Sequence, residues 1–131
     1  MRPPNNNNAY AIGKVIFGNQ CYVTYMVNGT ASFYVTMSDE TIDVLTAGAG
    51  CTFGWDDATD QTRPSNAFDL GSGDVASYAC RGFYSGPQSS GTQVGSVLRE
   101  DGADHCYFES FGSVYEPATP KAYEVLVLPA P

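Results

Sequence analysis

Two adjacent residues, His105 and Cys106, place a base beside a nucleophile in the sequence. A cysteine becomes a catalytic nucleophile when a nearby histidine can take its proton. Here both residues lie in a run typical of a β-strand, where neighbouring side chains point to opposite faces of the sheet. The sequence contains no nucleophile-elbow, zinc-protease or phosphate-loop motif. We therefore expect no catalytic residue and no enzymatic activity.

A single charge, Arg81, stands in the middle of an otherwise apolar run, directly after Cys80. A charged group on a packed strand needs a partner, because burying an unpaired charge is costly. The partner is either an acidic side chain in a structural ion pair or a ligand that meets the planar guanidinium. We expect a structural ion pair first, and a guanidinium that faces a ligand is the alternative that makes Arg81 a candidate ligand-binding residue.

Three aspartates, Asp56, Asp57 and Asp60, gather in one short polar segment. Oxygen-rich loops can bind Ca²⁺, but this spacing differs from that of an EF-hand, and a solvated acidic loop is the commoner explanation. The four cysteines contain no C-x-x-C pair, which argues against a zinc site. We expect neither a metal nor a cofactor.

The overall charge limits the partners of the protein. The net charge is −8, and the six basic residues are scattered along the chain. A scattered set forms no basic stripe that could neutralise phosphates or anionic lipid. No apolar run is long enough to cross a bilayer. We therefore expect no nucleic acid partner and no membrane span.

Short β-rich runs separated by glycine-rich turns make up most of the 131 residues. The strongest local signal is Asn28-Gly29 between apolar runs, which predicts a hairpin with a type I′ turn. Asn28 also begins a glycosylation sequon. No segment combines helical periodicity with caps, so the chain is predicted to be all-β. Strands are expected at residues 10–17, 21–27, 30–37, 41–45, 75–84, 95–98, 105–111 and 123–128, with a loop at 85–91.

The four cysteines, Cys21, Cys51, Cys80 and Cys106, allow three pairings into two disulfides. They are either buried small apolar residues or, in a secreted protein, two disulfides. Residues 1–9 lack an apolar signal-peptide core and are typical of a flexible tail. The chain is thus either intracellular or a mature secreted form, and we expect an extracellular or secreted protein.

The second half of the chain repeats features of the first half. An internal repeat indicates supersecondary units that bury their apolar faces against each other. Residues 10–131 are therefore expected to form one domain. The corresponding residues are Gly13 and Gly95, Val15 and Val97, Cys21-Tyr22 and Cys106-Tyr107, and 43–45 and 124–126.

A series of motifs occurs in the second half in a defined order: Trp55, Pro64–Phe68, Tyr78–Arg81, Val94–Ser96, Cys106-Tyr107, Phe111–Glu116 and Tyr123–Leu126. Over roughly seventy residues this order resembles the DM9 repeat (DUF3421) family. The first half keeps only the tail of such a unit, including Gly13-Lys14. The resemblance covers a partial unit at residues 10–50 and a fuller unit at residues 51–128.

This resemblance implies a compact β-sandwich or prism-like domain of two pseudo-symmetric units with interleaved strands. It also implies a lectin for mannose-type glycans. Lectins of the family contact sugar through an aspartate after the Asn-Ala segment and through the lysine of the Gly-Lys turn. These positions correspond here to Asp69 or Asp74 and to Lys14. Glu116 of the glycine-rich segment and Arg81 complete the candidate ligand-binding set.

Two departures from the family pattern leave the function open. Ser96 of the fuller unit stands where the family usually has lysine, and the partial unit lacks the segment that would supply its aspartate. The protein is either a non-enzymatic lectin-like module with a composite site, a structural, adhesion or assembly subunit without sugar binding, or a secreted effector. Incomplete units leave strand edges that need cover, which predicts a homodimer or larger assembly.

We expect Trp55 in the core.

Overall fold

The computed structural model describes residues 12–16, 20–35, 53–58, 62–70, 77–87, 90–119 and 122–128. These residues form strands and no helix, which confirms the predicted all-β class. Among them, no helical segment has the length and apolar character to cross a membrane. The expected tail at 1–9 and strand at 41–45 lie outside the described residues. The strands are β1 (Gly13–Ile16), β2 (Gln20–Val27), β3 (Thr30–Val35), β4 (Gly54–Asp57), β5 (Ala79–Ser85), β6 (Ser90–Glu100), β7 (Ala103–Ser110), β8 (Ser113–Tyr115) and β9 (Tyr123–Val127).

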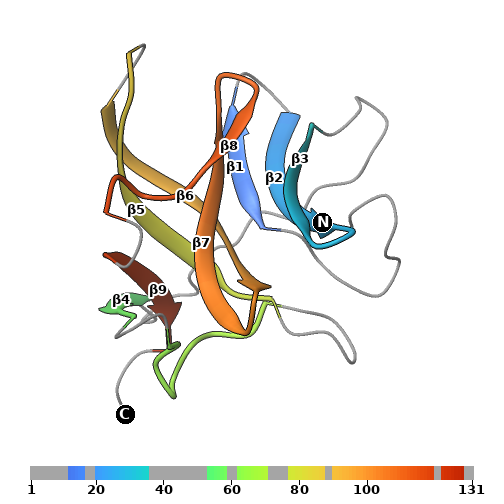
Figure 1. Cartoon of the computed structure of the whole chain (residues 1–131). Helices are drawn as coiled ribbons and strands as arrows, with labels where there is room; N and C mark the ends of the chain where they lie inside the picture. Colours follow the sequence, from blue (N-terminus) through green and yellow to red (C-terminus); the bar gives the residue numbers. More distant parts are fainter. Residues whose placement is uncertain are drawn as a thin grey trace.

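The first three strands form an antiparallel sheet in the order β1-β2-β3 (Figure 1). Asn28 and Gly29 join β2 to β3 with positive φ angles of 50° and 80°. A type I′ turn requires this conformation at both positions. Val27 pairs with Thr30 directly across the turn. The predicted hairpin is therefore confirmed.

The other six strands form a second antiparallel sheet in the order β4-β9-β5-β6-β7-β8. Strand β6 begins at Ser90 and ends at Glu100, so it is longer than the strand predicted at residues 95–98. The prediction of a loop at 85–91 was wrong for Ser85, Ser90 and Gly91, because Ser85 of β5 pairs with Ser90 and Tyr84 of β5 pairs with Gly91. Polar composition suggested a loop there, but pairing between β5 and β6 satisfies the backbone groups of these residues.

The larger core cluster lies on one face of the six-stranded sheet. A disulfide joins Cys80 of β5 to Cys106 of β7 within it. This bond is one of the pairings that four cysteines allow, and it leaves Cys106 no role as a nucleophile. Cys21 is buried with Val23 in a smaller cluster on β2, and Cys51 lies outside the described residues. The larger cluster consists of Ala58, Cys80, Tyr84, Cys106, Phe108, Tyr123 and Val125.

The two sheets are joined where β1 and β2 lie against β6 and β7 (Figure 1). The Ser96 hydroxyl accepts a hydrogen bond from the Ile12 amide at 3.0 Å and donates one to the Ile12 carbonyl at 2.7 Å. The Thr24 hydroxyl donates to the Tyr107 carbonyl at 2.9 Å. Hydrogen bonds between residues far apart in sequence thus set how one sheet sits on the other.

The repeated segments share one strand register. A Cβ atom at Gly13 would come within 1.8 Å of the Tyr22 carbonyl oxygen, and one at Gly95 within 1.9 Å of the Tyr107 oxygen. The close approach of the next strand explains why both copies have glycine there. The correspondence is local, since the described residues do not show the pseudo-symmetry of two whole units. In the first copy, Lys14 pairs with Tyr22 and Val15 with Cys21. In the second copy, the corresponding pairs are Ser96 with Tyr107 and Val97 with Cys106.

Candidate functional site

One row of charged side chains crosses three strands of the large sheet. Arg81 of β5 pairs with Glu124 of β9, and Glu124 pairs with Asp57 of β4. Residues directly opposite each other on antiparallel strands project from the same face. Phe83 lies two residues beyond Arg81, on the same face, and pairs with Thr92 of β6. The pairing of β4, β9, β5 and β6 thus assembles these side chains from distant parts of the chain.

Two neighbours hold the side chain of Arg81. Its Nε donates to Oε1 of Glu124 at 2.8 Å, and its Cζ lies 4.5 Å from the centroid of the Trp55 ring. The predicted ion pair is confirmed. Trp55 is half-buried and stacks against the guanidinium, whereas we expected it in the core; among the described residues it is not part of the larger core cluster. An arginine held by a carboxylate and an aromatic ring has a restricted orientation.

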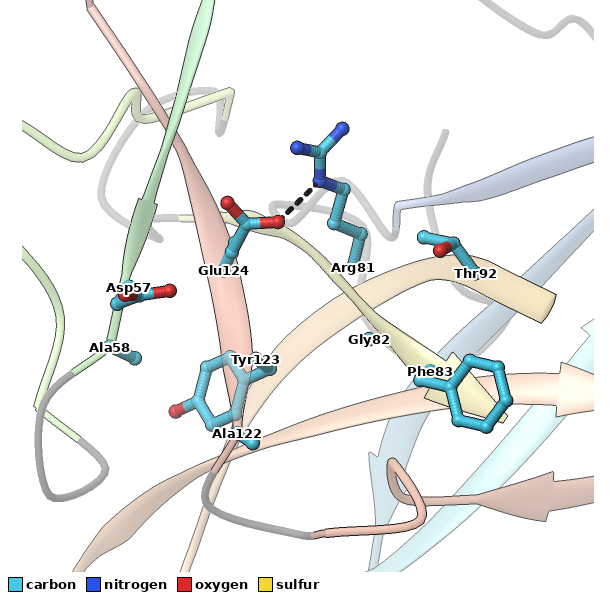
Figure 2. A pocket seen from close by; sticks show the side chains of 9 residues that line it. All are labelled: Asp57, Ala58, Arg81, Gly82, Phe83, Thr92, Ala122, Tyr123 and Glu124. Atoms are coloured by element: carbon cyan, nitrogen blue, oxygen red, sulfur yellow. Dashed lines mark hydrogen bonds and ion pairs between the residues drawn. The ribbon is translucent and has the colours of Figure 1, made fainter. Parts of the chain in front are cut away.

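The terminal nitrogens of Arg81 point away from Glu124 (Figure 2). Neither of them forms a hydrogen bond within the part of the chain that the structure describes. The Arg81 and Glu124 side chains are each 35% exposed, so solvent and ligands can reach them. The guanidinium is therefore oriented by the protein and still has free donors.

These side chains border an open pocket of about 500 Å³. This volume is within the range of small-ligand sites. Figure 2 shows Asp57 on one side, Phe83 and Thr92 on the other, and Glu124 and Arg81 between them. Phe83 is 54% exposed, which is unusual for a large aromatic side chain. The remaining lining residues are Ala58, Gly82, Ala122 and Tyr123.

Tyr123 is among the residues that line the pocket, but its side chain is buried in the larger core cluster, on the opposite face of β9 from Glu124. The hydroxyl donates to the Asp104 carbonyl oxygen at 3.1 Å in a buried hydrogen bond. Burial first, and then the charge of Asp104, raises the pKa of Tyr123 to about 12. The phenol is therefore neutral at physiological pH. It offers no charge to a ligand.

Among the described residues of the predicted ligand-binding set, Arg81 alone lines this pocket. Lys14 lies on β1, where its Nζ donates to Oε1 of Gln93 at 2.5 Å. Burial lowers the pKa of Lys14, and the charge of Glu109 opposes that shift. Lys14 therefore occupies the junction between the two sheets and does not line the pocket.

The other predicted residues are placed in separate local contacts. Asp69 accepts a hydrogen bond from the Ser77 amide at 3.0 Å. Glu116 approaches Nδ1 of His105 at 2.6 Å through its Oε1. Asp74 lies outside the described residues. The structure does not bring Asp69, Glu116 and Lys14 together with Arg81 in the described pocket.

None of the lining residues other than Arg81 was predicted as ligand-binding, including the three polar residues and the exposed aromatic residue, Asp57, Thr92, Glu124 and Phe83. The spacing of Arg81 and Phe83, two apart on a strand, was a signal that they share a face. The sequence singled out Glu124 only as part of the internal repeat. It singled out Asp57 only as one of three aspartates in a polar segment. Their proximity depends on strand pairing that no local pattern reports.

Among the described residues, no group of three or more His, Cys, Asp or Glu side chains is placed to hold a metal ion. Comparison with protein-family models, with curated proteins and with solved structures gave no match. The chemistry of the pocket itself is therefore the main guide to its function.

Proposed function

We propose that the protein is a non-enzymatic carbohydrate-binding module and that the pocket beside Arg81 is its binding site. One observation carries the proposal. Glu124 and Trp55 orient the Arg81 guanidinium at the rim of a pocket that the exposed Phe83 ring also lines, and its terminal nitrogens form no hydrogen bond within the described residues. Oriented polar groups beside an accessible aromatic face are what a ring of hydroxyls and C–H groups requires.

The pocket offers both kinds of hydrogen-bonding group that sugar hydroxyls use. Arg81 supplies donors, and the carboxylates of Asp57 and Glu124 supply acceptors. A sugar hydroxyl can donate a hydrogen bond to a carboxylate and accept one from the guanidinium. Phe83 offers an apolar surface for the C–H face of a sugar ring. The mixture is less suited to a purely apolar ligand, because such a ligand would desolvate three charges without replacing their hydrogen bonds.

The resemblance to the DM9 repeat family favours mannose-type glycans and directs attention to Lys14 as well. Lys14 lies on β1 beside Gln93 and is not among the residues that line the Arg81 pocket. The two candidate positions are therefore separable by mutation. Loss of mannose binding in Lys14→Ala alone would assign the site to the sheet junction, whereas loss in Arg81→Ala alone would assign it to the pocket.

The decisive test is a glycan array followed by calorimetry on each binding glycan. Phe83→Ala should weaken binding about tenfold, the effect of losing roughly 1.4 kcal/mol of ring contact. Phe111→Ala is the matched control, because Phe111 is 65% exposed and lies outside the pocket. Equal effects of the two variants, or a blank array from folded protein, would contradict the proposal.

A structural or assembly subunit is the second candidate, and Phe111 favours it. This residue sits at the tip of the β7–β8 hairpin with a φ of 49°, a conformation that costs a non-glycine residue about 1–2 kcal/mol. A strained and exposed aromatic side chain suggests a contact with a partner. Light scattering of wild type and Phe111→Asn tests it: a dimer that dissociates in the variant supports assembly, and a monomer at micromolar concentration opposes it.

An extracellular location is part of the same proposal. The disulfide between Cys80 and Cys106 is compatible with an oxidising compartment. Mass spectrometry of protein from its native source should find these two cysteines oxidised. Four free thiols in that material would contradict a secreted location.

A further inference from the structure

The pocket contains two carboxylates and one guanidinium, from Asp57, Glu124 and Arg81. Glu124 and Arg81 neutralise each other in their ion pair. Asp57 is exposed and forms no ion pair or hydrogen bond within the described chain. Among its described lining residues, the pocket therefore keeps one uncompensated negative charge, of the same sign as the net charge of −8. A field of this sign attracts cationic ligands and repels anionic ones.

The position of Asp57 keeps a bound cation away from Arg81. The two residues flank Glu124 on opposite sides, on β4 and β5. Two strand spacings separate β4 from β5, which is roughly 9–10 Å between backbones. The Debye length at physiological ionic strength is about 8 Å, so solvent ions screen most of the repulsion between Arg81 and a cation at Asp57. The carboxylate of Asp57 is thus open to an ammonium group.

An exposed aromatic ring lies at the other side of the same pocket. Figure 2 shows Phe83 across Glu124 and Arg81 from Asp57. A ligand that reaches from Asp57 on β4 to Phe83 on β5 must span two strand spacings, roughly 9–10 Å between backbones, which requires more than one sugar ring. Its charged group would meet Asp57 while another ring packs on Phe83.

We propose that the pocket selects oligosaccharides that carry free amino groups, of the glucosamine class, over their N-acetylated and acidic counterparts, with an ammonium group bound at Asp57. This inference rests on the proposed carbohydrate-binding function. N-acetylation removes the positive charge and adds an uncharged acetyl group while the sugar ring stays the same. The salt dependence of the difference between oligomers of equal length, and its loss in Asp57→Asn, therefore report the contribution of the charge. Acidic oligosaccharides bring a carboxylate into a pocket that already has an excess of negative charge.

The test is calorimetry of glucosamine oligomers against N-acetylglucosamine oligomers of the same length. We expect the amine form to bind about two- to fivefold more tightly, the size of one exposed charge pair, with the difference shrinking as salt rises. Asp57→Asn should abolish the difference. Asp56→Asn is the matched control, since it removes the same charge from the neighbouring exposed residue, which does not line the pocket.

The outcomes separate the two proposals. Equal affinity for the two oligomers, or an equal effect of Asp56→Asn and Asp57→Asn, overturns amine selection. Binding of neutral mannose-type glycans with no preference for the amine form also overturns it and leaves the carbohydrate-binding function standing. No binding to any oligosaccharide by folded protein overturns both.

Discussion

Cys80 and Cys106 are bonded across strand β6, which lies between their own strands β5 and β7. Their Cα atoms are 5.9 Å apart, whereas two strand spacings in a flat sheet amount to roughly 9–10 Å. The sheet must therefore curl over β6 at this point. Gly95 of β6 pairs with Cys80 and has no side chain to occupy the space beneath the disulfide.

Removing this disulfide should destabilise the fold strongly. The bond closes a loop with a sequence separation of 26 residues. Loop-entropy arguments predict a loss of about 3–4 kcal/mol in the free energy of unfolding for a Cys80→Ala, Cys106→Ala double variant. Urea unfolding followed by fluorescence measures it. A midpoint equal to that of wild type would show that packing alone maintains the curl.

Replacing Gly95 should be nearly as costly. A Cβ atom there would come within 1.9 Å of the Tyr107 carbonyl and 2.9 Å of the Phe108 Cβ, which forces β6 and β7 to move. We expect Gly95→Ala to lose about 3 kcal/mol in thermal or urea unfolding. Ser90→Ala, at the exposed start of the same strand, should change stability by less than about 0.5 kcal/mol.

The ion pair between Arg81 and Glu124 should contribute little to stability. Both side chains are 35% exposed, and water screens such pairs. A double-mutant cycle with Arg81→Ala and Glu124→Ala should give a coupling energy of about 0.5–1 kcal/mol that falls as salt is added. A coupling of several kcal/mol would mean that the pair is structural and would weaken its assignment to ligand binding.

Tyr123 should make the fold sensitive to high pH. Its pKa is raised from 10 in the unfolded chain to about 12, mainly by burial. The folded state therefore favours the neutral phenol, and the stabilisation is fully present below pH 10. It should decline as the pH rises through 12. Burial also raises the pKa of Tyr107, with a hydrogen bond to Glu100 as the next cause, so its effect has the same sign.

Unfolding free energies measured between pH 9 and pH 12 test this prediction, at about one-unit steps. Tyr123→Phe should show a shallower decline than wild type, because the variant has no phenol to ionise at that position. Tyr25→Phe is a control on the smaller sheet. Identical curves for wild type and Tyr123→Phe would show that another group governs the alkaline transition.

Short sequence patterns correctly predicted the turns and strands whose conformation is set by a few neighbouring residues. Asn28-Gly29 predicted the β2–β3 hairpin because a type I′ turn needs two residues that tolerate positive φ. The apolar runs predicted strands, although their ends were displaced, as in the glycine-rich start of β6. The repeat correctly anticipated a shared local feature, since Gly13 and Gly95 occupy equivalent places in two hairpins of equal register.

The sequence by itself determined the all-β class, the hairpin at Asn28 and the need of Arg81 for a partner. Only the tertiary structure decided that the partner is Glu124, that Asp57 and Phe83 share its pocket, and that Cys80 bonds to Cys106. Turns and strand propensities follow from the conformational energies of a few neighbouring residues. Strand order follows from long-range packing, in which β9 inserts between β4 and β5 and brings together residues separated by more than forty positions.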